Sequence, residues 1–155
     1  METGSWHVTR EGRIKRTALD FLNKDIVFLD DHFLFRDGVK RLCFDLFLKK
    51  MRLIQFDNGD AAYNYLVEEL REGRPPALIL TDILHPGMQG NDFVKAIRLL
   101  EKEMNTRHRI PIVVLSMVPE TTFPELTEDN IVDSYLPKTA EAEEIVDSLK
   151  RVLKL

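Results

Sequence analysis

The sequence predicts an α/β protein built on a doubly wound, five-stranded parallel sheet with helices on both faces. Two observations favour this class. Short runs of branched or large apolar residues recur along the chain, and segments with a helical apolar period separate them. Strands that alternate with helices form parallel sheets with right-handed crossovers, because each helix returns the chain to the same end of the sheet.

The predicted strands are short apolar runs bounded by charged, Pro or Gly residues, which is typical of strands buried on both faces. These runs are 26–29, 53–56, 77–80, 110–115 and, more weakly, 131–136. Apolar stripes at helical spacing lie in 62–70, 93–104 and 145–153. The segment 34–47 is also helical in pattern but apolar on more than one side, which indicates a more deeply buried helix.

The N-terminal part of the chain, residues 1–24, is predicted to be an extension that precedes the main domain at 25–155. Apolar residues of 13–24 share one helical face, so we expect an additional amphipathic helix from about residue 13. Such a helix either packs on its own domain or serves as a docking or dimer helix.

The segment 118–130 occupies the place where a fourth helix of the domain is expected. Pro124 lies in its middle, and a proline inside a helix costs ~3 kcal/mol. The sequence therefore predicts a short, broken or mobile helix here.

The composition excludes several classes of protein. The 155 residues carry 22 Lys and Arg against 26 Asp and Glu, so we expect no nucleic acid to bind this chain itself. The single cysteine, Cys43, excludes an intrachain disulfide and a Cys-rich zinc site. Neither a secretory signal nor an apolar run long enough for a membrane span is visible, so a soluble, cytoplasmic protein without a membrane partner is expected.

Charged and hydroxyl side chains follow four of the predicted strands, at the edge where ligands bind open parallel sheets. They are Asp30, Asp31, Asp82, Ser116 and Lys138. Each alone has a simpler explanation, such as a helix cap or a turn. Together, three carboxylates would repel one another unless a cation joined them, and Mg²⁺ prefers such oxygen ligands. An Asp beside Mg²⁺, an ammonium and a hydroxyl can attack a phosphoryl group and form an aspartyl phosphate.

Four segments resemble the receiver domain of two-component response regulators. They are Val-Phe-Leu-Asp-Asp at 27–31, Leu-Thr-Asp-Ile-Leu-His-Pro-Gly-Met-Gln-Gly at 80–90, Val-Val-Leu-Ser at 113–116 and Ser-Tyr-Leu-Pro-Lys at 134–138. The likeness runs from about Asp25 to Leu155. It implies a CheY-like sheet of strand order 2-1-3-4-5.

The resemblance also implies roles for the acidic residues. Asp82 would accept the phosphoryl group from a histidine kinase. Asp31 would bind Mg²⁺ directly, together with Asp82 and the backbone carbonyl of Leu84, while Asp30 would act mainly through water.

Three further residues would read out the phosphoryl group. Ser116 would move to donate a hydrogen bond to a phosphoryl oxygen, and Lys138 would pair with the same group. Tyr135 would rotate inward as Ser116 moves, which makes a two-state element biased by one local charge.

The implied protein is a signalling module and not a turnover enzyme. Its partners would be a sensor histidine kinase or a phosphotransfer protein, and a downstream protein or a second copy of the chain. The segment 30–38 and Thr139 resemble the NarL-type subfamily, whose receivers usually precede a helix-turn-helix domain. The chain is either a stand-alone receiver or one from which an effector domain after Leu155 is missing.

The predicted fold class is compatible with two other functions. A phosphorylation-independent interaction module would keep the receiver fold without using Asp82. A phosphohydrolase of the haloacid dehalogenase kind needs a second Asp two positions after the nucleophile, where this chain has Leu84.

Some positions depart from the family pattern. His85 stands where many receivers have Met, and we expect it to be exposed in a loop, or else to tune the lifetime of the phosphate. Met117 is bulkier than the small residue common at its position and could narrow access to the phosphate. The stretch between Asp82 and Ser116 is slightly long, which places the extra residues around Glu101–Arg109.

Overall fold

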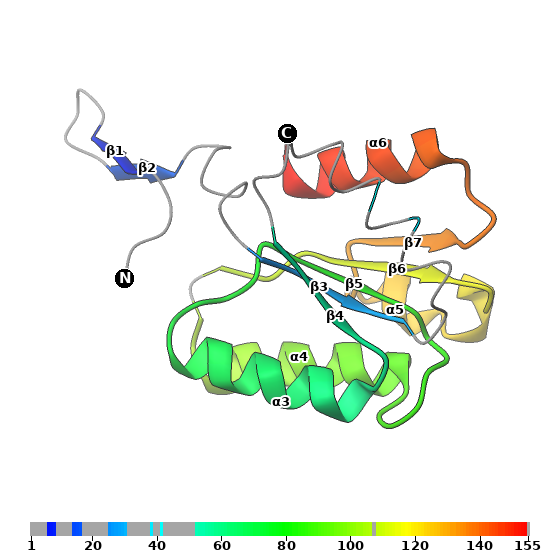
Figure 1. The fold of residues 1–155 in the computed structure, drawn as a ribbon, viewed down its shortest axis with the longest axis horizontal. Coiled ribbons are helices and arrows are strands. Elements are labelled where there is room, and N and C mark those ends of the chain that lie inside the picture. Colours follow the sequence, from blue (N-terminus) through cyan, green and yellow to red (C-terminus); the bar gives the residue numbers. More distant parts are fainter. Residues whose placement is uncertain are drawn as a thin grey trace.

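The computed structural model describes residues 6–8, 14–16, 25–30, 38, 41, 52–106 and 108–154. Within these residues the chain forms one sheet of two strands and one of five (Figure 1). Helices cover both faces of the larger sheet.

The larger sheet has the predicted topology. Its strands are β3 (Asp25–Leu29), β4 (Arg52–Phe56), β5 (Leu78–Thr81), β6 (Ile112–Ser116) and β7 (Ser134–Pro137). All four neighbouring pairs are parallel, and the order β4-β3-β5-β6-β7 is the 2-1-3-4-5 arrangement. The doubly wound α/β fold is therefore confirmed.

The two faces of the sheet are covered by different helices. The helices α3 (Gly59–Arg71) and α4 (Gly90–Glu103) pack on one face, and α6 (Ala142–Leu153) lies on the other (Figure 1). The strands β3, β5 and β6 are buried almost throughout, because both of their faces are covered. Within the described residues, no helix is long and apolar enough to span a bilayer.

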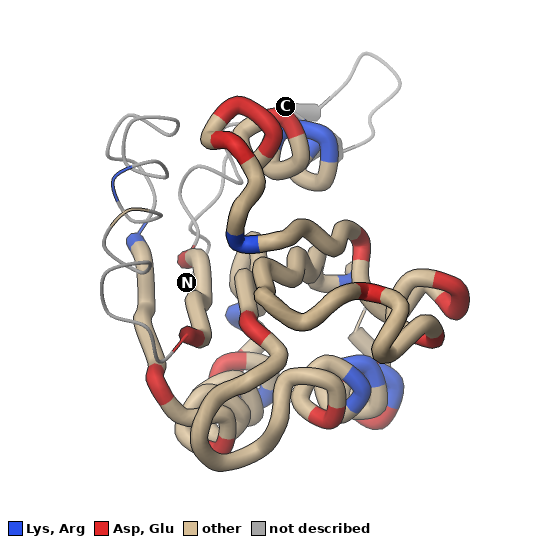
Figure 2. The backbone as a smooth tube through the Cα atoms, turned by 90° about the vertical axis from the view of Figure 1, so that its right-hand side faces the viewer, with Lys and Arg blue, Asp and Glu red and all other residues tan. Residues whose placement is uncertain are grey.

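The ends of the long helices are set by local chemistry. Asn58 caps α3, and its side chain accepts hydrogen bonds from the first backbone N–H groups of the helix. In α6, Glu141 and Glu144 form a capping box. Acidic residues dominate the start of α6 and basic residues its end, as the helix dipole favours (Figure 2).

The segment between β6 and β7 contains no long helix. It holds a 3-10 turn, η1 (Glu120–Thr122), and the four-residue helix α5 (Glu125–Glu128). Pro124 directly precedes α5, where its missing N–H is not needed. The prediction of a short, interrupted helix is confirmed.

The prediction of an N-terminal helix from about residue 13 is wrong where the structure describes it. Ile14–Arg16 form β2, which pairs antiparallel with β1 (Trp6–Val8). A short amphipathic segment is marginal as a helix on its own, and strand pairing satisfies the same backbone groups. The rest of that expected helix lies outside the described residues. So does the predicted helix at 34–47, except for Gly38 and Arg41, which are helical.

Candidate functional site

Three strand ends bring predicted site residues to one edge of the sheet. Asp30, Asp82 and Lys138 directly follow β3, β5 and β7. Backbone hydrogen bonds continue the sheet through all three. The Asp82 N–H donates to the Leu29 carbonyl at 2.9 Å, and the Lys138 N–H donates to the Ser116 carbonyl at 3.0 Å. The side chains are therefore placed by rigid strand geometry.

The ammonium group of Lys138 lies between two carboxylates. Its Nζ is 2.9 Å from Asp30 Oδ2 and 2.6 Å from Asp82 Oδ2. The exposed fractions of the three side chains are 11% for Lys138, 1% for Asp30 and 7% for Asp82. Burial lowers the pKa of Lys138, but hydrogen bonds and charge from Asp82 and Asp30 outweigh this effect and raise the pKa above its usual value. The lysine is therefore held charged.

The second oxygen of Asp82 is held by the backbone that follows it. Asp82 Oδ1 accepts hydrogen bonds from the Ile83 N–H at 2.6 Å and, more weakly, from the Leu84 N–H at 3.4 Å. Gly90 packs against the same backbone, since a Cβ there would lie 2.2 Å from the Asp82 carbonyl oxygen. This close approach fixes the loop between β5 and α4, so one carboxylate oxygen is oriented and the other faces Lys138.

The two predicted switch residues share one backbone partner. Ser116 is buried, and its Oγ accepts a hydrogen bond from the Val118 N–H at 3.0 Å. The Tyr135 hydroxyl donates to the Val118 carbonyl at 2.5 Å. Burial raises the pKa of Tyr135, the Ser116 hydroxyl lowers it, and the Asp82 charge adds to the increase. Val118 could not be found from the sequence, because a contact made by backbone atoms leaves no residue-type signal.

The described part of the site thus has the predicted acid, lysine and hydroxyl groups at one sheet edge. Residues 26–150 match the family model of the response regulator receiver domain. The chain belongs to this family.

Similar proteins agree with this assignment. The response regulator GacA of Pseudomonas aeruginosa is 27% identical over 128 residues, which cover 82% of this chain and 54% of that protein. The chain therefore spans about half the length of this relative.

Solved structures show the same fold. A DNA-binding response regulator of the LuxR family from Staphylococcus aureus matches with a TM-score of 0.65 at 24% identity, over 84% of this chain and 98% of that one. The BeF3-activated receiver domain of RstA from Klebsiella pneumoniae matches with a TM-score of 0.64 at 23% identity, over 84% and 99%.

The donor chemistry of the receiver site fits a hard divalent cation. Asp30 and Asp82 bring two carboxylates to one ammonium, so the described residues carry an excess negative charge there. Oxygen donors with excess negative charge suit Mg²⁺. Asp31, the predicted direct ligand, lies outside the described residues, and among the described residues no three acidic, His or Cys side chains gather as a metal site. The ligand set, including the Leu84 carbonyl, stays a prediction.

His85 is not exposed, contrary to the expectation. It is 5% exposed, and its ring stands edge-on to Phe93 with centroids 6.5 Å apart. A Cβ at Gly59 would lie 2.8 Å from its Cε1, so the ring fills the space at the start of α3. The packing of α3 against this loop therefore buries the His85 ring, although a polar loop residue is usually exposed.

Two apolar side chains are exposed beside the site. Leu84 follows Asp82 by two positions and is 56% exposed, and Met117 follows Ser116 and is 67% exposed. The long Met117 side chain therefore presents much of its surface to solvent.

Proposed function

We propose that this receiver accepts a phosphoryl group on Asp82 from the phosphohistidine of a sensor histidine kinase or a phosphotransfer protein. The observation that supports this most directly is the position of the Lys138 ammonium, 2.6 Å from Asp82 Oδ2 and 2.9 Å from Asp30 Oδ2. A buried cation beside a strand-end carboxylate is suited to hold the oxygens of an incoming phosphoryl group.

The chain supplies the nucleophile and part of its electrostatic surroundings. An Asp82 oxygen attacks phosphorus as the phosphorus–nitrogen bond of the donor breaks, and the imidazole leaves with the bonding pair. The Ile83 N–H orients the carboxylate, and Lys138 offsets charge on the phosphoryl oxygens. Bound Mg²⁺, held directly by Asp31, Asp82 and the Leu84 carbonyl and through water by Asp30, would neutralise further charge on the same oxygens.

The output would be a change in protein–protein contact. In the acylphosphate, the Ser116 hydroxyl would turn from the Val118 N–H to a phosphoryl oxygen. Tyr135, which is bonded to the Val118 carbonyl, would then lose its present anchoring geometry. The partner that senses this change would be a downstream protein or a second copy of the chain.

The test is intact-mass measurement after incubation with Mg²⁺ and a small phosphodonor such as acetyl phosphate. We expect a gain of one phosphoryl group that Asp82→Asn abolishes and chelation of Mg²⁺ suppresses. Asp57→Asn is a matched control, because Asp57 is an exposed acid after the neighbouring strand β4. It is expected to be phosphorylated like the wild type.

Two results would contradict the proposal. One is a wild-type chain that gains no phosphoryl group from acetyl phosphate and shows no Mg²⁺-dependent NMR change with beryllofluoride. The other is phosphorylation that survives Asp82→Asn. Partner binding that persists in Asp82→Ala would instead support a phosphorylation-independent module.

A further inference from the structure

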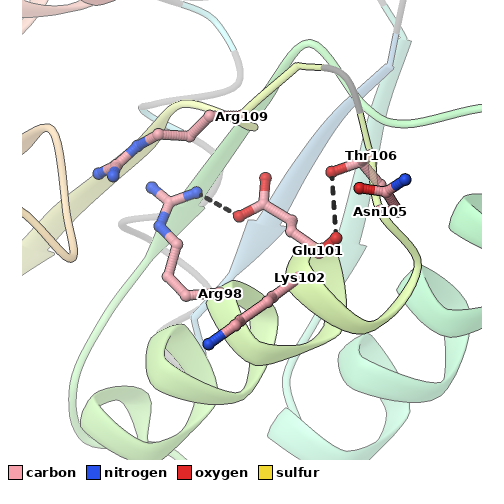
Figure 3. Close-up of a pocket in the computed structure, with 6 residues that line it drawn as sticks. All are labelled: Arg98, Glu101, Lys102, Asn105, Thr106 and Arg109. Atoms are coloured by element: carbon pink, nitrogen blue, oxygen red, sulfur yellow. Dashed lines mark hydrogen bonds and ion pairs between the residues drawn. The ribbon is translucent and has the colours of Figure 1, made fainter.

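A polar pocket lies at the edge of the sheet opposite the acceptor site, where α4 ends and the chain returns to β6 (Figure 3). Its volume is about 370 Å³. The residues that line it are Arg98, Glu101, Lys102, Asn105, Thr106 and Arg109. Most of them belong to the segment in which the sequence places extra residues relative to other receivers. Phosphoryl transfer at Asp82 does not use this pocket.

The floor of the pocket is a fixed ion pair. Arg98 Nη1 donates to Glu101 Oε1 and to the Ile110 carbonyl, each at 2.8 Å, and Arg98 Nε donates to the Ile131 carbonyl at 2.8 Å. Asp133 Oδ2 lies 3.2 Å from Arg98 Nη2. The other Glu101 oxygen accepts the Ile110 N–H at 2.6 Å. These contacts hold both side chains in place without a ligand.

The rim carries donors that this network does not use. Among the described residues, Lys102 and the side chain of Asn105 have no hydrogen bond or ion pair. Arg109 contacts the segment before β7 through Nη2 alone, which leaves its other N–H groups. The Thr106 hydroxyl, by contrast, donates its one proton to the Glu101 carbonyl, at 3.4 Å (Figure 3). The unused groups are therefore mainly hydrogen-bond donors.

The charge of the lining points in the same direction. Three cations, Arg98, Lys102 and Arg109, line the pocket together with one anion, Glu101. Asp133 pairs with both arginines but does not line the pocket. When it is counted with Glu101, the three cations still exceed the anions by one charge. Spare N–H donors and excess positive charge at an open pocket select an anionic ligand.

We propose that this pocket binds a small ligand that carries a phosphate group. The guanidinium of Arg109, which has spare N–H groups, and the Lys102 ammonium match phosphate oxygens in geometry and charge. The volume lies within the range of small-molecule sites and exceeds what one oxyanion needs, so a phosphate ester fits better than the free ion. The site is separate from the acceptor site because Asp82 lies at the carboxyl ends of the strands and this pocket at their amino ends.

The experiment is an NMR titration of the ¹⁵N-labelled full chain with glycerol 3-phosphate and, separately, with inorganic phosphate. A chelator removes divalent cations, so that phosphate is not drawn to the Asp82 site. We expect saturable shifts of the amides at 101–106 and 108–110 in the millimolar range, and tighter binding of the ester. Tighter binding of inorganic phosphate would assign the pocket to the free ion, within the same phosphate chemistry.

The matched variants separate a site from general charge attraction. Lys102→Ala removes one rim cation and is expected to weaken binding about fivefold, the upper range for an exposed ion pair. Asn105→Gly removes the amide while suiting the positive φ of 52° at that position, and is also expected to weaken binding. Lys95→Ala lies on the same helix but outside the pocket, and is expected to bind like the wild type.

Shifts at 101–110 that do not saturate with either probe would overturn the proposal. Equal weakening by Lys95→Ala and Lys102→Ala would also overturn it, since that result indicates only screening of surface charge. Neither outcome bears on phosphorylation of Asp82, which is measured independently by mass.

Discussion

The two edges of the five-stranded sheet hold buried charge in different ways. At the carboxyl edge, one ammonium, that of Lys138, faces the carboxylates of Asp30 and Asp82. At the amino edge, the guanidinium of Arg98 pairs with Glu101 and Asp133, and it also donates to the backbone carbonyls of Ile110 and Ile131.

The difference separates charges that stabilise the fold from charges that are proposed to take part in phosphoryl transfer. The charges of the amino-edge network balance once Arg109 joins Asp133, and both Glu101 oxygens are hydrogen-bonded. The carboxyl edge keeps an excess negative charge and a carboxylate oxygen beside a cation, which suits the binding of a metal and a phosphoryl group. The phosphate ligand proposed for the amino edge would use the spare donors of Lys102, Asn105 and Arg109, and would leave the contacts of Arg98 and Glu101 intact.

The largest expected effect is on stability at the amino edge. Glu101→Ala leaves the Arg98 guanidinium and the Ile110 N–H without their carboxylate. We expect a loss of about 3 kcal/mol in the free energy of unfolding, the lower range for breaking a buried pair, because Asp133 remains. Urea denaturation measures it. Glu103→Ala, an exposed acid on the same helix, is the control and should change stability by less than about 0.5 kcal/mol. If both variants lost the same free energy of unfolding, the ion pair at the amino edge would not be a special source of stability.

The carboxyl edge depends on close backbone packing, and Gly90→Ala tests this. The added Cβ would lie 2.2 Å from the Asp82 carbonyl oxygen and 2.5 Å from the Ile83 Cα. We expect a loss of about 1–3 kcal/mol, typical of overpacking, together with slower phosphorylation of Asp82. Gly38→Ala is the control, since an added Cβ there meets no atom of the described residues within 4 Å. Normal phosphorylation of a folded Gly90→Ala variant would show that this approach does not orient the acceptor.

The smallest expected effect concerns alkaline pH. The folded-state pKa of Lys138 is raised, so its contribution to stability is fully present below the unfolded pKa of about 10.4 and is lost as the pH rises through the folded value. Lys138→Met should therefore show a shallower fall in the free energy of unfolding above about pH 10.4 than the wild type. Urea titrations across this range measure the two slopes. Identical slopes would mean that the two carboxylates do not stabilise the charged lysine.

Much of the fold and site can be predicted from the sequence because the signals are local. Apolar runs such as 26–29 and 53–56 predict strands, and the residue after each strand falls at the carboxyl edge whatever the details of packing. Pro124 likewise predicts the short α5, because its effect on a helix does not depend on distant residues.

The remaining features depend on contacts between distant segments. His85 looks like an exposed loop residue, and only the approach of α3 at Gly59 shows that its ring is buried. Arg98 and Glu101 show a helical spacing, but the carbonyls that surround the guanidinium come from other elements. In the N-terminal extension, a strand partner at Trp6–Val8 competes with the helical period around Ile14.

The shared contact at Val118 gives the proposed signal a short mechanical route. Val118 donates its N–H to Ser116 and accepts a hydrogen bond from Tyr135 at its carbonyl. A movement of either side chain therefore changes a contact with the same residue. Val118 is half-buried and begins the connection that leads into η1 and α5, where only a few residues are helical. Movement of the Ser116 hydroxyl toward a phosphoryl group would therefore first affect this connection, which contains little regular secondary structure. The strands of the sheet would not have to move.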